Sequence, residues 1–160
     1  VLDPDMSDKS VCWPNESPIE CEFRLNRPSF VLIRLSTNDA AGYGAGNPEL
    51  VQVKLQAIVR LCIQRGVIPI IGTKADRVEG PDNSYNAIIR QIAASNQIPL
   101  WDFDRVAQTL PNNGLGPDQI HLTPLYPADY TLPVAFERGH GMANLTALIA
   151  LERVWRAATR

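Results

Sequence analysis

His121 is one of only two histidines in this chain of 160 residues, and it lies three positions after an acidic residue, Asp118. A turn between the two positions would bring the Asp118 carboxylate to the His121 imidazole. There it would fix the ring tautomer and stabilise the imidazolium that forms when histidine acts as a base. The spacing therefore predicts a general base with its orienting acid. The alternative is structural, with Asp118 capping the start of a surface helix.

Other polar residues follow apolar runs and are further candidates. Asn38 and Asp39 come directly after such a run, where a side-chain amide can donate a hydrogen bond to a developing oxyanion. Asn and Asp are also ordinary turn residues, so a turn is the alternative interpretation. Lys74 and Asp76 either line the same site or pair with each other, and the local ion pair is favoured. His140 lies between two glycines, which indicates a loop histidine.

Three apolar runs predict the strands that must position these side chains. They cover 29–35, 66–72 and 98–103, although Pro69 in the second run favours an edge position. Helical spacing predicts helices that start at Pro48 after Asn47, at 84–95, at 104–110 and around Leu145–Trp155. The alternation indicates an α/β fold with parallel strands, in which ligands bind at the carboxyl ends of the strands.

Residues 1–28 show neither helical nor strand periodicity and contain four prolines, so we expect an irregular segment followed by one domain over 29–160. Three cysteines cannot all pair. A disulfide between Cys12 and Cys21 is favoured over two free thiols, and Cys62 is expected in the core. The disulfide would indicate a secreted or extracytoplasmic protein.

Composition excludes several classes of protein. Fifteen basic and seventeen acidic residues give a net charge of −2, which offers no electrostatic reason to bind nucleic acid. No apolar run approaches the roughly 20 residues of a membrane span. Two histidines and distant cysteines disfavour a metal site. The chain starts at Val1 without Met, which indicates a removed leader or a piece of a longer protein.

Two stretches carry a resemblance to a known family. Ser36–Asp39 after an apolar strand, and Gly116–Thr123 much later, resemble the third and fifth conserved blocks of the SGNH (GDSL-type) hydrolases. The resemblance implies a flavodoxin-like parallel sheet with flanking helices, and ester hydrolysis through an acyl-enzyme without a cofactor. It implies that Asn38 donates to the oxyanion, that His121 activates a serine and that Asp118 orients His121.

The first two blocks of that family, a Gly-Asp-Ser turn and a glycine whose N–H completes the oxyanion hole, are absent from the chain. The resemblance therefore indicates the C-terminal part of such a domain, with the nucleophilic serine upstream and no activity of the 160 residues alone. A missing N-terminal segment or another chain is expected to pair with the strand at 31–35. The substrate would be a small-molecule, carbohydrate or lipid acyl ester, and the residues proposed to contact it are Ser36, Asp39, Lys74 and Tyr126. The rival function is a non-catalytic carbohydrate- or ligand-binding module. A receiver or nucleotide-binding domain is disfavoured because the first strand lacks a phosphate-binding glycine loop.

Overall fold

The computed structural model of the chain describes residues 1–38, 47–126 and 128–160. Its centre is a parallel sheet of three strands, β1 (Phe30–Ile33), β2 (Ile68–Gly72) and β3 (Leu100–Trp101), in the order β1-β2-β3. Phe30 pairs with Ile68, and Ile71 pairs with Leu100. The predicted α/β fold with a parallel sheet is confirmed, and each strand is shorter than the apolar run that predicted it.

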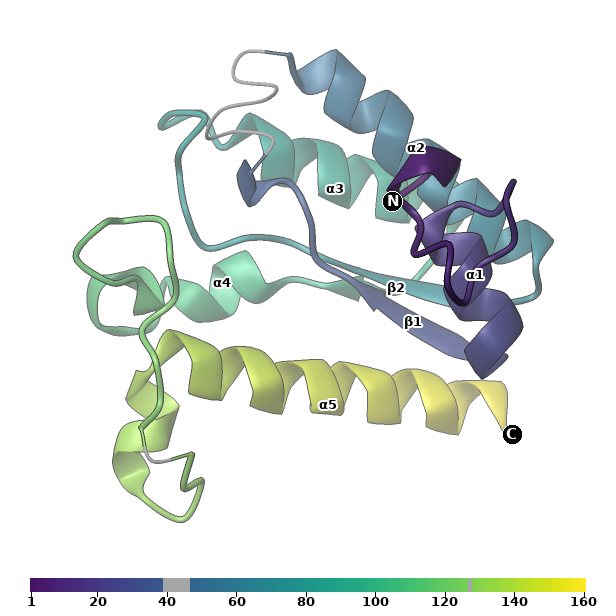
Figure 1. Cartoon of the computed structure of the whole chain (residues 1–160). Helices are drawn as coiled ribbons and strands as arrows, with labels where there is room; N and C mark the ends of the chain where they lie inside the picture. The colour runs from purple at the N-terminus through teal and green to yellow at the C-terminus, as the bar shows by residue number, and fades with distance from the viewer. Residues whose placement is uncertain (39–46, 127) are drawn as a thin grey trace.

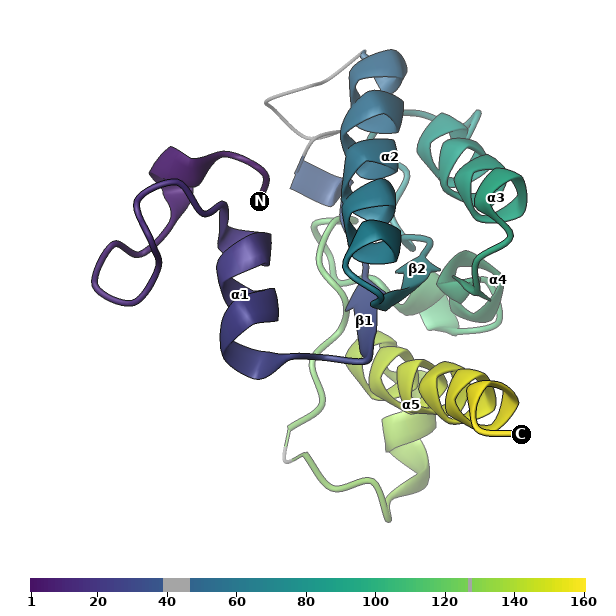
Figure 2. The same cartoon turned by 90° about the vertical axis from the view of Figure 1, so that its right-hand side faces the viewer.

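Helices cover both faces of this sheet (Figures 1 and 2). Helices α2 and α3 lie on one face, and α5 lies on the other with the short α4 beside it. The helices are α1 (Pro18–Asn26), α2 (Pro48–Gln64), α3 (Ser84–Asn96), α4 (Phe103–Ala107) and α5 (Gly139–Ala158), and short 3₁₀ turns cover Pro4–Met6, Pro111–Gly114 and Pro133–Glu137. Among the described residues, no helix is both long enough and apolar enough to cross a bilayer.

Two apolar clusters hold the layers together. The first lies between the sheet and helices α1, α2 and α3, and its fully buried members include Val59, Cys62 and Ile71. The second lies between the sheet, α4 and α5, and contains Ile70 and Phe103. Successive residues of β2 therefore point to opposite faces, and both faces are buried, as expected for a parallel strand between helices. Cys62 lies in the core, as the sequence predicts.

Pro69 does not place β2 at an edge, because β2 is the central strand of the three. The Ile68 N–H donates toward β1, to the Ser29 carbonyl, whereas the Ile71 N–H donates toward β3, to the Pro99 carbonyl. In a parallel ladder successive residues bond to alternate sides, so the N–H that Pro69 lacks would face β3. Pairing with β3 begins only at Ile71, so the proline removes no ladder hydrogen bond.

The prediction of an irregular segment over 1–28 is wrong in its second half, because residues Pro18–Asn26 form α1. Ser17 and Glu20 form a capping box at its start, and Pro18 occupies the first turn, where proline is favoured. The buried Cys21 and Phe23 supply its apolar face. The prolines that suggested a loop thus mark the start of a short helix.

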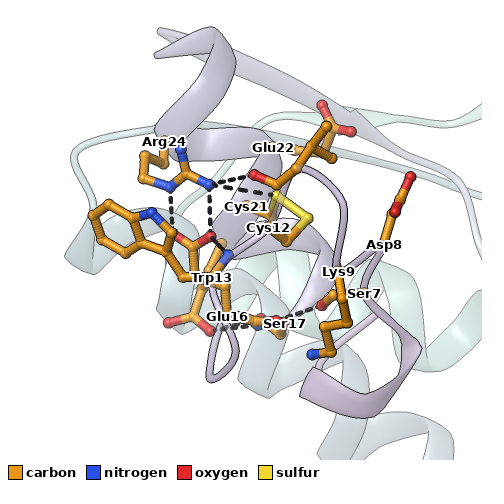
Figure 3. The surroundings of a disulfide bond; sticks show 12 residues. Ser7, Asp8, Lys9, Cys12, Trp13, Glu16, Ser17, Cys21, Glu22 and Arg24 are labelled. Atoms are coloured by element: carbon orange, nitrogen blue, oxygen red, sulfur yellow. Dashed lines mark hydrogen bonds and ion pairs between the residues drawn. A yellow bond between two sulfur atoms is a disulfide. The ribbon is translucent and has the colours of Figure 1, made fainter.

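The expected disulfide between Cys12 and Cys21 is present, and it ties the N-terminal loop to α1 (Figure 3). Arg24 of the same helix binds Glu16 through two hydrogen bonds, of 2.6 and 2.9 Å, and its guanidinium lies 4.4 Å from the centre of the Trp13 ring. These contacts hold the segment before β1 in one conformation.

Candidate functional site

The loop that carries His121 is folded onto itself by backbone hydrogen bonds. The Gly116 N–H donates to the His121 carbonyl at 2.7 Å, and the Thr123 N–H donates to the Gly114 carbonyl at 2.8 Å. Leu115 and Leu122 form an isolated antiparallel bridge within the same loop. The apolar side chains of both leucines pack into the second core cluster. The backbone at His121 is therefore fixed from both sides.

The start of α5 fixes the position of this loop in the molecule. Thr123 accepts a hydrogen bond from the Gly139 N–H at 2.7 Å through its hydroxyl, and one from the His140 N–H at 3.1 Å through its carbonyl. A β-carbon on Gly139 would lie 2.1 Å from the Gly114 carbonyl oxygen, so only glycine allows this approach. His140 is in the first turn of α5, so the expectation of a loop histidine is wrong. The two flanking glycines allow the backbones of Gly114 and Ala135 to approach the start of α5 closely.

His121 and Asp118 contact each other directly. The His121 Nδ1 lies 2.7 Å from one oxygen of the Asp118 carboxylate, and the N–H groups of Ile120 and His121 donate to the other at 3.0 Å each. The hydrogen bonds from the His121 ring and from these two N–H groups lower the pKa of Asp118 to about 2. Asp118 therefore stays ionised at neutral pH and holds the proton of His121 on Nδ1. Asp118 caps a turn, and no helix begins at residues 118–121, so the alternative of a cap at the start of a surface helix is wrong.

The second candidate region is the carboxyl end of β1. Ser36 is buried and has a φ of +94°, in a region that favours glycine. Thr37 donates from its hydroxyl to the Asp76 carboxylate at 2.8 Å, across 39 residues of sequence. Asn38 is exposed and lines a cavity of about 840 Å³, together with Ser36, Thr37 and residues of α2 and the N-terminus. Strain at a position beside a polar, open site is typical of functional backbone.

His140 links the two regions electrostatically. Partial burial lowers the pKa of His140, and the positive charges of Arg34 and His121 lower it further. Arg34 is in the chain just before Ser36, so His140 lies within electrostatic range of both the end of β1 and the His121 loop. Charges from the regions of both sequence motifs, more than 70 residues apart, thus act on the same histidine.

The other residues proposed to contact a substrate differ in position. Lys74 is 2 % exposed, and its Nζ binds Asp76 at 2.7 Å and also Glu79. The favoured local ion pair is therefore present, and the lysine is too enclosed to contact a substrate directly. Tyr126 is 88 % exposed and follows the His121 loop. Asp39 lies outside the described residues.

Sequence reasoning missed a second ionic cluster, at the carboxyl end of β3. Asp104 is 1 % exposed and binds Arg90 at 2.7 Å, Arg77, and the Asn83 amide at 3.0 Å. Burial acts to raise the pKa of Asp104, but these hydrogen bonds together outweigh it and lower the pKa to about 2. No local spacing signals this cluster, because its members lie on three different segments.

Within the described part of the chain, no three or more His, Cys, Asp and Glu side chains form a group that could hold a metal ion. The two candidate regions contain an imidazole bound to a carboxylate and an exposed amide side chain. Comparison of the chain with models of protein families, with curated proteins and with solved structures finds no match.

Proposed function

We propose that this chain supplies the histidine, aspartate and asparagine of a serine ester hydrolase of the SGNH type. His121 is the base, Asp118 orients it, and Asn38 donates to the oxyanion. The nucleophilic serine comes from a polypeptide segment outside these 160 residues, and no cofactor takes part. The flavodoxin-like order of the complete sheet belongs to the same proposal.

The observation that carries the proposal is the geometry of His121 and Asp118. The 2.7 Å contact engages Nδ1, and no hydrogen bond to Nε2 is found among the described residues. The ring is 80 % exposed, so Nε2 faces solvent and can accept a proton from a hydroxyl group. No serine of the described chain hydrogen-bonds to His121, which agrees with an external nucleophile.

The reaction would proceed in two halves. The serine Oγ attacks the ester carbonyl carbon while its proton moves to Nε2 of His121, and the Asn38 amide donates to the oxyanion that forms. The alcohol then leaves with the proton from Nε2, and water repeats the sequence to release the acid. The substrate is an acyl ester of a small molecule, carbohydrate or lipid. Ser36, Asp39 and Tyr126 are the candidate contacts with it.

The free edge of β1 is where the serine-bearing segment is proposed to pair. β1 is at the edge of the three-stranded sheet; Leu32 on it is 37 % exposed and Leu35, just after it, is 40 % exposed. Figure 2 shows α1 beyond this edge, on the side away from β3. Four apolar residues of α2 line the cavity beside the end of β1, and Val1 also lines it. A segment joined to Val1 would therefore enter next to an unpaired strand edge, which binds extended peptide readily.

The disulfide supports a location outside the reducing cytosol, so we place the protein in a secreted or extracytoplasmic setting.

The test compares the 160-residue chain with a full-length polypeptide, in which the native upstream sequence precedes these 160 residues. The full-length protein should hydrolyse p-nitrophenyl acetate, and His121→Ala should reduce kcat by a factor of about 10³ or more. The 160-residue chain should show no turnover. Hydrogen exchange at the amides of residues 30–33 should slow in the full-length protein because the outer edge of β1 is then paired.

Different results would contradict separate parts of the proposal. His121-dependent burst kinetics from the 160-residue chain would mean that it contains its own nucleophile. Full-length protein that binds sugars or esters but never turns them over would favour the non-catalytic binding module. Protection of β1 that rises with the concentration of the 160-residue chain would show that a second copy, rather than an upstream segment, covers the edge.

A further inference from the structure

A buried ionic cluster at the carboxyl end of β2 reaches across to the end of β1. It consists of Lys74, Asp76 and Glu79, whose side chains are 2 %, 3 % and 4 % exposed. The Lys74 Nζ donates to the Asp76 carboxylate at 2.7 Å and to the Asp76 carbonyl at 3.0 Å, and it also binds Glu79. We call these three residues the Lys74 cluster.

The backbone of the Lys74 cluster is held as firmly as its side chains. Asn86 of α3 is fully buried, accepts from the Lys74 N–H at 2.9 Å and donates to the Lys74 carbonyl at 2.8 Å. Arg34, which directly follows β1, is attracted to Asp76 and lies 5.3 Å from the Trp101 ring centre. Two carboxylates thus share one ammonium and have a guanidinium nearby.

Such a cluster is a poor way to gain stability. Removing charges from water costs several kcal/mol per ion, and apolar side chains of the same volume often stabilise a protein as well or better. The more informative property of the Lys74 cluster is its rigidity. A rigid buried anion that faces a neighbouring strand end can hold the backbone there in place.

One hydrogen bond connects the Lys74 cluster to the candidate site. The Thr37 hydroxyl donates to the Asp76 oxygen that Lys74 does not bind, at 2.8 Å. Thr37 precedes Asn38 and follows the strained Ser36, so this bond fixes the residue between the end of β1 and the amide donor. Thr37 and Asp76 are the points where the two strand ends are joined.

We infer that Asp76 is a positioning residue, which acts through the Thr37 hydroxyl to hold the Asn38 amide where an oxyanion forms. The inference rests on the proposed function for the role of Asn38, and on the hydrogen bond between Thr37 and Asp76 for the positioning itself. An amide donor held in advance needs no reorganisation during the reaction, and this preorganisation is the main source of oxyanion stabilisation.

Thr37→Val is the cleanest variant, because it removes the hydroxyl at constant shape and leaves the Lys74 cluster intact. Thr37→Ser restores the hydroxyl and serves as the rescue. Thr109→Val is the matched control, since the Thr109 hydroxyl bonds only locally, to the Val106 carbonyl at 2.7 Å, on an exposed turn. Asp76→Asn is the second probe, which keeps an acceptor for Thr37 but removes the charge that Lys74 binds.

The first measurement needs no activity. In the 160-residue chain, the ¹H–¹⁵N heteronuclear NOE of the Asn38 backbone amide should fall in Thr37→Val and recover in Thr37→Ser. It should be unchanged in Thr109→Val, and the melting temperature of Thr37→Val should stay close to that of the parent. An Asn38 amide equally ordered in Thr37→Val would overturn the positioning role.

The second measurement uses the full-length protein. Thr37→Val should lower kcat by about 10-fold with KM nearly unchanged, which is less than the about 10²–10³-fold loss expected when an oxyanion donor is removed outright. Thr37→Ser should recover most of kcat, and Asp76→Asn should lower it at least as much as Thr37→Val. If each variant that lowers kcat also lowers the melting temperature, the role of Asp76 would be merely structural. A parent protein without any esterase activity would refute the proposed function, whereas an active parent with unaffected variants would refute only the positioning by Asp76.

Discussion

The chain pairs acidic with basic side chains in two settings that differ in their contact with water. Asp118 and His121 form a pair on a loop, with side chains 49 % and 80 % exposed. Asp104 binds Arg77 and Arg90 in a setting where its own side chain is only 2 % exposed. Both carboxylates have a pKa lowered to about 2. The same lowering of pKa thus arises from two different environments.

The comparison separates orientation from stability. Water competes for the exposed pair, so its contribution to the free energy of unfolding is small, and what the pairing fixes is the direction of the His121 ring. The buried carboxylate has no such competitor, and loss of its charge would leave Arg77 without its carboxylate partner and Arg90 with Asp102 alone. Asp104 is therefore expected to matter for stability and Asp118 for chemistry.

The largest expected effect is on the buried side of the comparison. Asp104→Asn should lower the free energy of unfolding by about 3 kcal/mol, because Arg77 loses its carboxylate partner and Arg90 keeps only Asp102. Urea denaturation followed by circular dichroism would measure the loss. If Asp104→Asn were as stable as the parent, the buried cluster would not be the stabilising one.

Acid should affect the two pairs unequally. Folding lowers the pKa of Asp104 from 3.8 to about 2, so the unfolded chain takes up this proton more readily than the folded one. The resulting stabilisation is complete above about pH 4 and is lost as the pH falls toward 2, at a cost of about 2 kcal/mol. Urea titrations between pH 6 and 2 should show this loss in the parent and in Asp118→Asn. In Asp104→Asn the slope over this range should be shallower, and an unchanged slope would assign the acid sensitivity to other carboxylates.

Ser36 offers a test at the end of β1. Its φ of +94° is strained for a residue with a β-carbon, so Ser36→Gly should raise the free energy of unfolding by about 1 kcal/mol. Gly66→Ala makes the opposite change at another positive φ, of +70°, where a β-carbon would meet open space. Gly66→Ala should therefore destabilise the folded protein through backbone strain alone. A Ser36→Gly variant less stable than the parent would show that contacts of the buried serine side chain outweigh the strain.

The smallest effect on stability is expected at the exposed pair. Asp118→Asn should leave the free energy of unfolding nearly unchanged, because water screens the exposed pair. It should nevertheless allow the His121 ring to reorient, which would appear as a changed pattern of ¹⁵N shifts of the imidazole at constant pH. An Asp118→Asn variant as destabilised as Asp104→Asn would remove the distinction between the two settings.

Much of the fold could be predicted because its signals are local. Continuous apolar runs marked all three strands, and Asn47 with Pro48 marked the start of α2. Prolines in residues 1–28 favour a loop by local pattern, whereas Pro18 in fact begins helix α1, because proline is also favoured in the first turn of a helix. The prediction from Pro69 that β2 is an edge strand is wrong. Whether the proline removes a ladder hydrogen bond depends on where β3 begins to pair, which is not a property of β2.

The candidate site divides in the same way. The spacing of Asp118 and His121 by itself determined their contact, because a turn of four residues closes on itself through its own backbone and side-chain hydrogen bonds. Only the tertiary structure decided that Thr37 meets Asp76, that Lys74 is enclosed, and that His140 lies near both Arg34 and His121. These contacts join segments tens of residues apart, and packing of the sheet between its helices, rather than any local preference, brings such segments together.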